Sequence, residues 1–396
     1  MTRPPDPPRD AVRERGRVAN AHDIDPPAWS AVEPSPPIPP AAEPARLVPL
    51  EEVRRAAERV RGVVLRSPLL PFGQPLPGDA LGRTRAYLKA ENLQPTGAFK
   101  LRGAYNAIAS LPPESRAAGV VAHSSGNHAR GVSRAARLLG VRAVIVMPAG
   151  APAIKVAGVR DDGAEIVFVG PSSEERAETA AALAEREGMS LVPSYDDPAI
   201  IAGQGTIGLE IVEQLAELDG RPAPVPTGRP DETFEVAPVT VVVPVGGGGL
   251  ASGIGVAVKS LLPLARIVGV EPALAADARD SIRAGRIVRW DAELVARTSA
   301  DGMRTVALSP LTFAHLTRYL DDIVTVEEIE IAAAMARAAR DARLVLEPSG
   351  ATALAAWLFH SSDLLAEGRV VCVLSGGNVD PEGYASMIGQ AEGVAG

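Results

Sequence analysis

The chain has 396 residues, a formal net charge of −8, and 4% aromatic residues within a hydrophobic content of 46%. This length favours two domains, and a core of small aliphatic residues is typical of α/β proteins whose helices pack on parallel sheets. The basic residues are scattered through an acidic chain, which argues against nucleic acid and anionic membrane surfaces as partners.

The first 46 residues are rich in Pro, Arg, Asp and Glu. Proline removes backbone donors and breaks helices, and little in this stretch can form a core. We expect a disordered tail, or a translated stretch upstream of the true start codon. Order begins near Leu47, and the spacing of charged and apolar residues predicts a helix over 50–60.

Strand and helix patterns then alternate along the chain. Strands are predicted at 86–89, 120–122, 143–147, 166–169, 191–192, 239–243, 267–270, 323–326 and 370–374. Helices are predicted over 129–139, from 152, over 173–187 and 199–218, from 250, and over 327–342 and 351–359. The Pro-rich stretch 220–238 is an interdomain linker or, as we prefer, a surface insertion, because the pattern resumes at once. Such alternation predicts parallel sheets with ligands at the carboxyl ends of strands.

Two further features concern the cellular location. Cys372 is the single cysteine, which excludes an internal disulfide, and it lies in an apolar run where we expect a buried side chain. No apolar run reaches membrane-spanning length, and the N-terminus has no apolar signal-peptide core. These features predict a cytoplasmic, reducing location.

One lysine stands between a turn and the start of a helical pattern. The stretch 95–104 places Lys100 directly after Phe99, behind a Gly-containing turn. Such a lysine can be a surface residue at a helix start. It can also be an amine that condenses with a carbonyl group.

Four consecutive glycines, Gly246, Gly247, Gly248 and Gly249, follow a buried strand and precede a helix. Without side chains, their backbone N–H groups can approach a phosphate closely, and the helix N-terminus adds partial positive charge. The alternative is a flexible turn, but the flanking strand and helix favour a phosphate site. The segment is no Walker loop, because no Gly-Lys-Ser/Thr follows.

Two other polar segments follow predicted strands. The loop 124–128 offers hydroxyls, an amide and backbone donors at a helix start, which suits a carboxylate or ordinary N-capping. Glu271 ends a strand and Asp277 follows in a loop. Two carboxylates there can hold a hard cation, although a solvated acidic turn is the simpler interpretation.

Together these segments resemble the pyridoxal-phosphate enzymes of fold type II, specifically the threonine/serine dehydratase and serine racemase group. The match runs from about Leu47 to Gly383. The segments that carry it, in chain order, are the lysine motif 95–104, the substrate-carboxylate loop 124–128, the cofactor phosphate loop 246–249 and the loop 375–378 beside the pyridine nitrogen. Segments 301–305 and 347–351 also look like parts of the family. Ala98 departs from it, because the family more often has Ser there.

The resemblance implies an α/β fold with two domains, each a twisted, mostly parallel sheet flanked by helices. The large cofactor-binding domain would comprise 47–117 and 197–396, and the small substrate-side domain 118–196. A homodimer is what the family suggests.

The resemblance also implies roles for single residues. Lys100 would form a Schiff base with the cofactor and then act as the base on the Cα proton, with Phe99 packed near the ring. Asn127 would contact the phenolic oxygen, Gly246 to Gly249 the phosphate, and Ser375 the pyridine nitrogen. A neutral serine there makes the ring a weaker electron sink, which suits β-elimination.

Further roles concern the substrate and a metal ion. The backbone of Ser124, Asn127 and His128 would hold the α-carboxylate, and Ser125 matches the residue that acts on the opposite face in racemases. The spacing of Glu271, Ala275 and Asp277 is similar to the Mg²⁺ or Ca²⁺ site of metal-activated members. Arg304 is a candidate contact for a second carboxylate, or a surface or packing arginine.

These roles predict a pyridoxal-phosphate-dependent ammonia-lyase whose small-molecule substrate is a β-hydroxy amino acid, with L-threonine or L-serine first, converted to a 2-oxo acid and ammonia by α,β-elimination. Two alternatives within the class are a serine or amino-acid racemase and a threo-3-hydroxyaspartate ammonia-lyase. From a different class, the protein could be a non-catalytic binding protein for pyridoxal phosphate or an amino acid.

Overall fold

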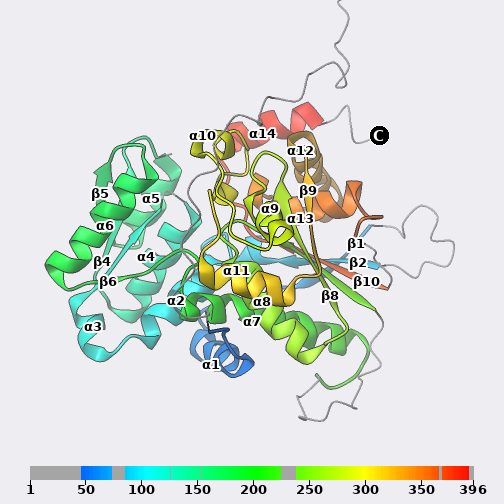
Figure 1. The fold of residues 1–396 in the computed structure, drawn as a ribbon, viewed down its shortest axis with the longest axis horizontal. Coiled ribbons are helices and arrows are strands. Elements are labelled where there is room, and N and C mark those ends of the chain that lie inside the picture. The colour runs from blue at the N-terminus through cyan, green and yellow to red at the C-terminus, as the bar shows by residue number, and fades with distance from the viewer. Residues whose placement is uncertain are drawn as a thin grey trace, which may run out of the picture. The chain divides into compact units, whose positions relative to one another are not determined.

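The computed structural model describes residues 46–73, 85–124, 126–151, 153–223, 238–364 and 368–391. The predicted tail up to residue 45, Pro152 and most of the Pro-rich stretch lie outside these ranges. The described chain forms two β-sheets flanked by helices (Figure 1). No helix within those ranges is both long enough and apolar enough to cross a membrane.

The larger sheet has six strands in the order β1-β2-β10-β7-β8-β9. Their bounds are β1 Leu69–Phe72, β2 Arg85–Ala90, β7 Val239–Pro244, β8 Arg266–Pro272, β9 Asp322–Val326 and β10 Arg369–Leu374. The edge strand β1 is antiparallel to β2, and the other neighbouring strands are parallel. This confirms the predicted parallel-rich α/β architecture.

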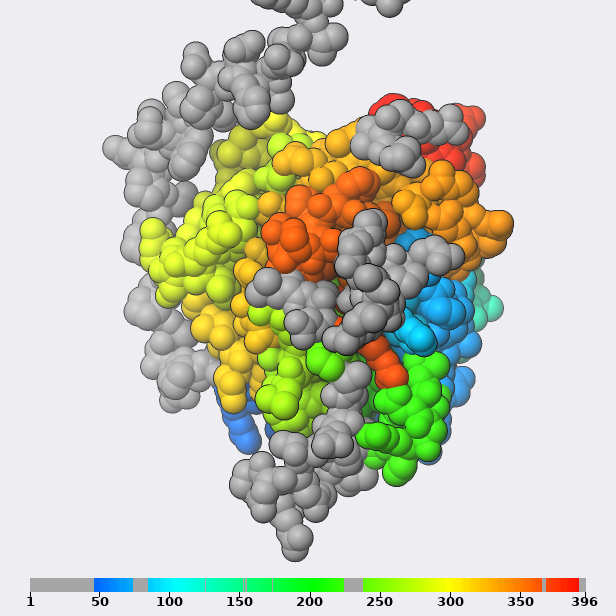
Figure 2. Space-filling view, turned by 90° about the vertical axis from the view of Figure 1, so that its right-hand side faces the viewer, coloured from blue at the N-terminus to red at the C-terminus, as the bar shows by residue number. Residues whose placement is uncertain are grey.

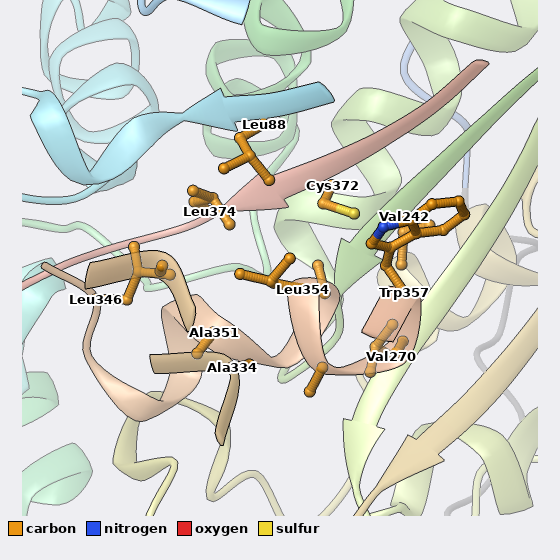
Figure 3. Close-up of a cluster of buried hydrophobic side chains, with 14 of the residues drawn as sticks. Leu88, Val242, Val270, Ala334, Leu346, Ala351, Leu354, Trp357, Cys372 and Leu374 are labelled. Atoms are coloured by element: carbon orange, nitrogen blue, oxygen red, sulfur yellow. The ribbon is translucent and has the colours of Figure 1, made fainter. Parts of the chain in front are cut away.

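Apolar side chains cover both faces of this sheet, because successive residues of a strand point to opposite sides. On one face, Leu88, Val242 and Cys372 pack with residues of α12 (Glu328–Arg337) and α13 (Pro348–Phe359), as Figure 3 shows. The other face packs against α7 (Pro198–Leu218) and α8 (Gly249–Leu261). Cys372 is fully buried, as its sequence context predicts.

The smaller sheet has four parallel strands in the order β5-β4-β3-β6. Their bounds are β3 Val120–His123, β4 Ala143–Pro148, β5 Glu165–Val169 and β6 Ser190–Leu191. Helix α4 (Asn127–Leu139) packs on one face, and α6 (Ser173–Glu187) packs on the other. Helix α5 (Ala153–Asp161) contacts α4 and β5.

The remaining helices complete the layers around the two sheets. They are α1 Leu50–Val60, α2 Lys100–Ser110, α3 Pro113–Ala118, α9 Asp277–Ala284, α10 Ala292–Val295, α11 Pro310–Tyr319 and α14 Pro381–Gln390. Short turns of 3₁₀-helix lie at η2 Glu91–Leu93 and η3 Asp301–Met303, and a π-helical turn, η4 Ala338–Ala342, follows α12.

Helix α2 packs between the two sheets' helical layers. It contacts α4 of the smaller sheet and α7 of the larger one. The approach is close, because a Cβ added at Gly131 of α4 would lie 3.0 Å from the Lys100 carbonyl carbon, and one at Gly203 of α7 would lie 2.6 Å from the Gly103 Cα atom. The helix that begins at Lys100 is therefore fixed from two sides.

Candidate active site

Loops at the carboxyl ends of neighbouring parallel strands form the centre of the candidate site. We name them the lysine loop (95–99, after β2 and η2), the glycine loop (246–249, after β7) and the Ser375 loop (375–378, after β10). These three strands are neighbours in the larger sheet. A fourth, the Ser124 loop (124–128), follows β3 of the smaller sheet.

The lysine loop and the Ser375 loop are joined backbone to backbone. Ala98 forms an antiparallel bridge with Gly376, and the Phe99 N–H donates to the Ser375 carbonyl at 3.1 Å. Ala98 is fully buried at this bridge. The pairing places the Ser375 hydroxyl beside the start of α2, where it donates to the Ser349 carbonyl at 3.4 Å.

Lys100 is the first residue of α2, and its amine is buried at this junction. Nζ donates to the Ser194 carbonyl at 2.7 Å and lies 5.1 Å from the centre of the Phe99 ring. Burial lowers the pKa of Lys100 to about 8. A substantial neutral fraction near pH 7–8 lets the amine act as a nucleophile or a base.

The glycine loop lies against Tyr195, the residue after the one that binds Lys100. A Cβ added at Gly247 would lie 2.2 Å from the Tyr195 ring, and Gly248 has a φ of +88°. Side chains are excluded here for both steric and backbone reasons. The first N–H groups of α8 have no intrahelical partner, so the loop offers donors to an anion.

Asn127 and His128 belong to the first turn of α4, whereas the sequence predicted that both lie in a loop before the helix. Asn127 Nδ2 donates to Glu347 Oε1 at 2.5 Å, and Asn127 Oδ1 accepts from Asn378 Nδ2 at 2.8 Å. The amide is thereby tied to the segment before α13 and to the Ser375 loop.

Glu347 is a site residue for which sequence patterns predict no role, although the segment 347–351 resembles part of the family. It is buried, and burial, with a further contribution from the charge of Asp301, raises the pKa of Glu347 to about 8. A Cβ added at Gly376 would lie 2.1 Å from Glu347 Oε1. An acid placed directly before Pro348 and an apolar helix is the signal that could have indicated it.

The Ser124 loop is described at Ser124, Asn127 and His128, whereas Ser125 lies outside the described residues. Ser124 Oγ accepts from the Gly126 N–H at 3.2 Å. The His128 ring is buried and its Nε2 bonds the Val192 carbonyl at 2.8 Å. Burial, followed by the charge of Lys100, lowers the pKa of His128 to about 3 and keeps the ring neutral.

Glu271 lies in a strand, as predicted, whereas Asp277 begins a helix instead of lying in a loop. Glu271 is part of β8, and Asp277 is the first residue of α9. The Glu271 carboxylate accepts the N–H groups of Ala278 and Arg279 at 3.0 and 2.7 Å, so it stabilises the start of α9. Within the ranges that the structure covers, no three His, Cys, Asp or Glu side chains gather as metal ligands.

Arg304 is an exposed residue whose side chain is bound to the backbone. Its Nε and Nη2 atoms donate to the Thr298 carbonyl at 3.0 and 2.6 Å.

The arrangement therefore combines a buried amine of lowered pKa, a glycine-lined anion site and a helix N-terminus. A family model described as "Pyridoxal-phosphate dependent enzyme" matches residues 60–376. The chain belongs to this family. The match confirms the resemblance that the motifs carry, and it indicates pyridoxal phosphate as the cofactor.

Individual members of the family are similar over most of the chain. L-threo-3-hydroxyaspartate ammonia-lyase from Saccharomyces cerevisiae is 39% identical over 341 residues, which cover 86% of this chain and 96% of that protein. L-threonine ammonia-lyase from Thermotoga maritima is 40% identical over 334 residues, covering 84% and 76%. The structure of maize serine racemase superposes with a TM-score of 0.74 at 34% identity, covering 88% of this chain and 99% of that one.

Proposed function

We propose that the protein is a pyridoxal-phosphate-dependent ammonia-lyase that converts a β-hydroxy amino acid, L-threonine or L-serine first, to a 2-oxo acid and ammonia. The observation that carries this proposal is the buried Lys100 amine, whose pKa is lowered to about 8, beside the Ser375 loop and the Ser194–Tyr195 segment that touches the glycine loop. Two relatives that are 39% and 40% identical are named ammonia-lyases, which supports the reaction class.

The residues present fit the cofactor. The glycine loop leaves no room for a Cβ at Gly247 and presents the N-terminus of α8, which suits the phosphate. Lys100 would hold the aldehyde carbon beside Phe99, the Ser375 hydroxyl would face the pyridine nitrogen, and Asn127 would face the phenolic oxygen. When bound, the cofactor supplies a conjugated ring that stabilises negative charge at the substrate Cα.

The protein's own groups would bind the substrate and move its protons. Backbone N–H groups of the Ser124 loop, at the N-terminus of α4, would hold the α-carboxylate. Neutral Lys100 Nζ would take the Cα proton, and its lowered pKa makes this form available near neutral pH. The same proton is then available to the departing hydroxyl, which leaves as water. One water is taken up when ammonia is released, so the net products are the 2-oxo acid and ammonia.

The test is oxo-acid production from L-threonine, L-serine and L-threo-3-hydroxyaspartate. Lys100→Ala should abolish turnover and the cofactor absorption band that borohydride removes. Lys259→Ala serves as a matched control, because Lys259 lies in α8 and pairs with Asp321 at 2.7 Å, away from the loops of the site. Full activity in Lys100→Ala would overturn the proposal.

A racemase is the second candidate within the class. The Ser124 loop carries Ser125, and the likeness to maize serine racemase supports this candidate. Chiral analysis of serine after incubation decides between the two activities. Loss of racemisation in Ser125→Ala, with elimination retained, would assign racemisation to that hydroxyl.

A cofactor band with no turnover of any amino acid would instead favour a binding protein. The homodimer remains a prediction, which light scattering of the holoprotein would check.

We further propose a divalent cation, Mg²⁺ or Ca²⁺, at Glu271, the Ala275 carbonyl and Asp277. Both carboxylate oxygens of Asp277 are buried without a hydrogen-bond partner among the described residues. Burial, followed by the charge of Asp280, raises the pKa of Asp277 to about 8. Burial and the nearby Asp277 also raise the pKa of Glu271. A hard cation would neutralise both carboxylates.

The cation proposal predicts that Mg²⁺ or Ca²⁺ raises the melting temperature of the protein and that a chelator reverses this. Asp277→Asn should remove the response. Asp341→Asn, at a carboxylate that already pairs with Arg337, should keep it. A response that survives in Asp277→Asn would contradict this location.

A further inference from the structure

An ion pair beside the candidate site joins helix α5, which belongs to the smaller sheet's layer, to the short turn η3. Lys155 Nζ in α5 pairs with Asp301 Oδ2 in η3, 146 residues further along the chain. The Lys155 side chain is 14% exposed and that of Asp301 is 41% exposed. The cation is therefore held in the protein, whereas its partner can turn into water.

Lys155 lies next to the loop that would bind the substrate carboxylate. A Cβ added at Gly126 would lie 3.7 Å from Lys155 Nζ. Next to Asp301 in the chain, the Gly302 N–H donates to Ser349 Oγ at 3.0 Å, and the Ser349 carbonyl accepts from the Ser375 hydroxyl. The charges of Asp301 and Lys155 both act on the pKa of Glu347, in opposite directions. The pair thus stands among residues of the site.

We propose that Lys155 is a specificity-determining residue that binds the second carboxylate of a dicarboxylic β-hydroxy amino acid such as 3-hydroxyaspartate, and that Asp301 is the anion it gives up. This inference rests on the proposed function. The Ser124 loop offers backbone donors for one carboxylate, so a second carboxylate needs a cation of its own. Lys155 can supply it, since its ammonium sits on a flexible stem with three donors.

The exchange is energetically feasible because the pair is partly exposed. Asp301 is 41% exposed, so water solvates its carboxylate once the pair opens, whereas the ammonium of Lys155, 14% exposed, then needs another anion. Asp301 can return to water, and the ammonium then meets a carboxylate that the substrate holds in place. Arg304, the other candidate for this role, is bound to the Thr298 carbonyl.

A different role for the pair would be purely structural, in that it would only hold α5 against η3. The two roles predict different signs for the two halves of the pair. If the pair is only structural, neutralising Lys155 and neutralising Asp301 should have the same effect on activity, because either change removes the ion pair. In a specificity site, loss of Lys155 removes the attraction for the second carboxylate, whereas loss of Asp301 removes its competitor.

The experiment compares kcat/KM for L-threo-3-hydroxyaspartate with that for L-threonine in the holoenzyme. Lys155→Gln should lower the ratio by roughly 10- to 100-fold, the worth of a hydrogen bond to a charged group. Asp301→Asn should raise the ratio. Lys259→Gln, which removes another lysine–aspartate pair, should leave the ratio unchanged.

Two outcomes would overturn the inference. Either the ratio stays constant in Lys155→Gln, or the two substitutions shift it in the same direction. If the wild-type enzyme turns over neither amino acid, the proposed function fails instead. The inference can then still be tested by calorimetry, which gives the affinities (1/Kd) for L-threo-3-hydroxyaspartate and L-threonine. Lys155→Gln should lower the ratio of these affinities, and Asp301→Asn should raise it.

Discussion

The substitution Arg102→Met is expected to destabilise the protein strongly without touching the cofactor. Arg102 lies two residues after Lys100 in α2, and its side chain is fully buried. Its Nε and Nη2 atoms each donate to Glu91 at 2.8 Å, and Nη1 donates to Glu210 at 2.7 Å. Lys89, also buried, bonds Glu210 from the other side.

The magnitude follows from what the substitution leaves behind. Glu91 is fully buried and would keep only weaker partners, such as the hydroxyl of Ser67 and the amide of Gln94. Breaking a buried pair by removing one partner costs about 3–5 kcal/mol of unfolding free energy. A domain is stable by about 5–15 kcal/mol, so this loss is a large share of the total.

Urea unfolding followed by circular dichroism gives the free energy and the slope m. The matched control is Arg142→Met, since Arg142 also pairs with two glutamates, Glu165 and Glu187, but is 45% exposed. Water solvates both glutamates once Arg142 is removed, so little change is expected there. Equal losses in the two variants would refute the reasoning.

The pH dependence gives a second check on Arg102. Burial alone would raise the pKa of Glu91, but the charge and hydrogen bonds of Arg102, together with the charge of Lys89 and the Ser67 hydroxyl, hold the pKa below its usual range. The wild-type protein therefore loses this contribution as the pH falls through the folded pKa. In Arg102→Met, burial prevails and the raised pKa makes acidification stabilising. The difference in unfolding free energy between the wild-type protein and Arg102→Met should therefore decrease toward low pH. An increase in that difference would contradict the pairing of Glu91 with Arg102 as its cause.

Two more predictions concern the loops. Gly97→Ala should lower the free energy of unfolding by roughly 1–2 kcal/mol, because φ is +73° at this position. It should also weaken cofactor binding, because the new Cβ would lie 2.3 Å from Asn378 Oδ1. The control Gly140→Ala, at φ +65° with nothing within 4 Å, should show only the loss from the backbone. The pKa of Glu347 is raised to about 8, so the wild-type protein should lose stability as the pH rises from about 5 to 8. Glu347→Gln lacks this titration and should become more stable relative to the wild-type protein over the same range. A difference in melting temperature between the two proteins that stays constant with pH would contradict this.

Local patterns predicted the regular elements well. The helices over 50–60 and 173–187 were predicted with the bounds that the structure has. Both have regular amphipathic or polar spacing, and the second begins at a serine cap. The strand β1 was missed because it contains Pro71, which an edge strand tolerates since one side of it needs no ladder hydrogen bonds.

The centre of the site was predictable only in part. Lys100 and the glycine loop are short, continuous segments whose composition already indicates chemistry. Glu347 binds Asn127, which lies 220 residues away in the sequence. Tyr195 contacts the glycine loop, which is also distant from it in the sequence. Such partners are set by how the two sheets' loops pack, and no local periodicity encodes that packing.

The position of β10 has a consequence for how the chain is made. This strand, near the C-terminus, lies between β2 and β7 in the larger sheet, and Figure 2 shows blue and orange segments as neighbours on one face. The smaller sheet uses a continuous stretch of chain, so it can form while the ribosome is still translating. The larger sheet has a gap until the last 30 or so residues emerge. A nascent or truncated chain therefore exposes the edges of β2 and β7, whose unpaired backbone N–H and C=O groups can pair with another chain.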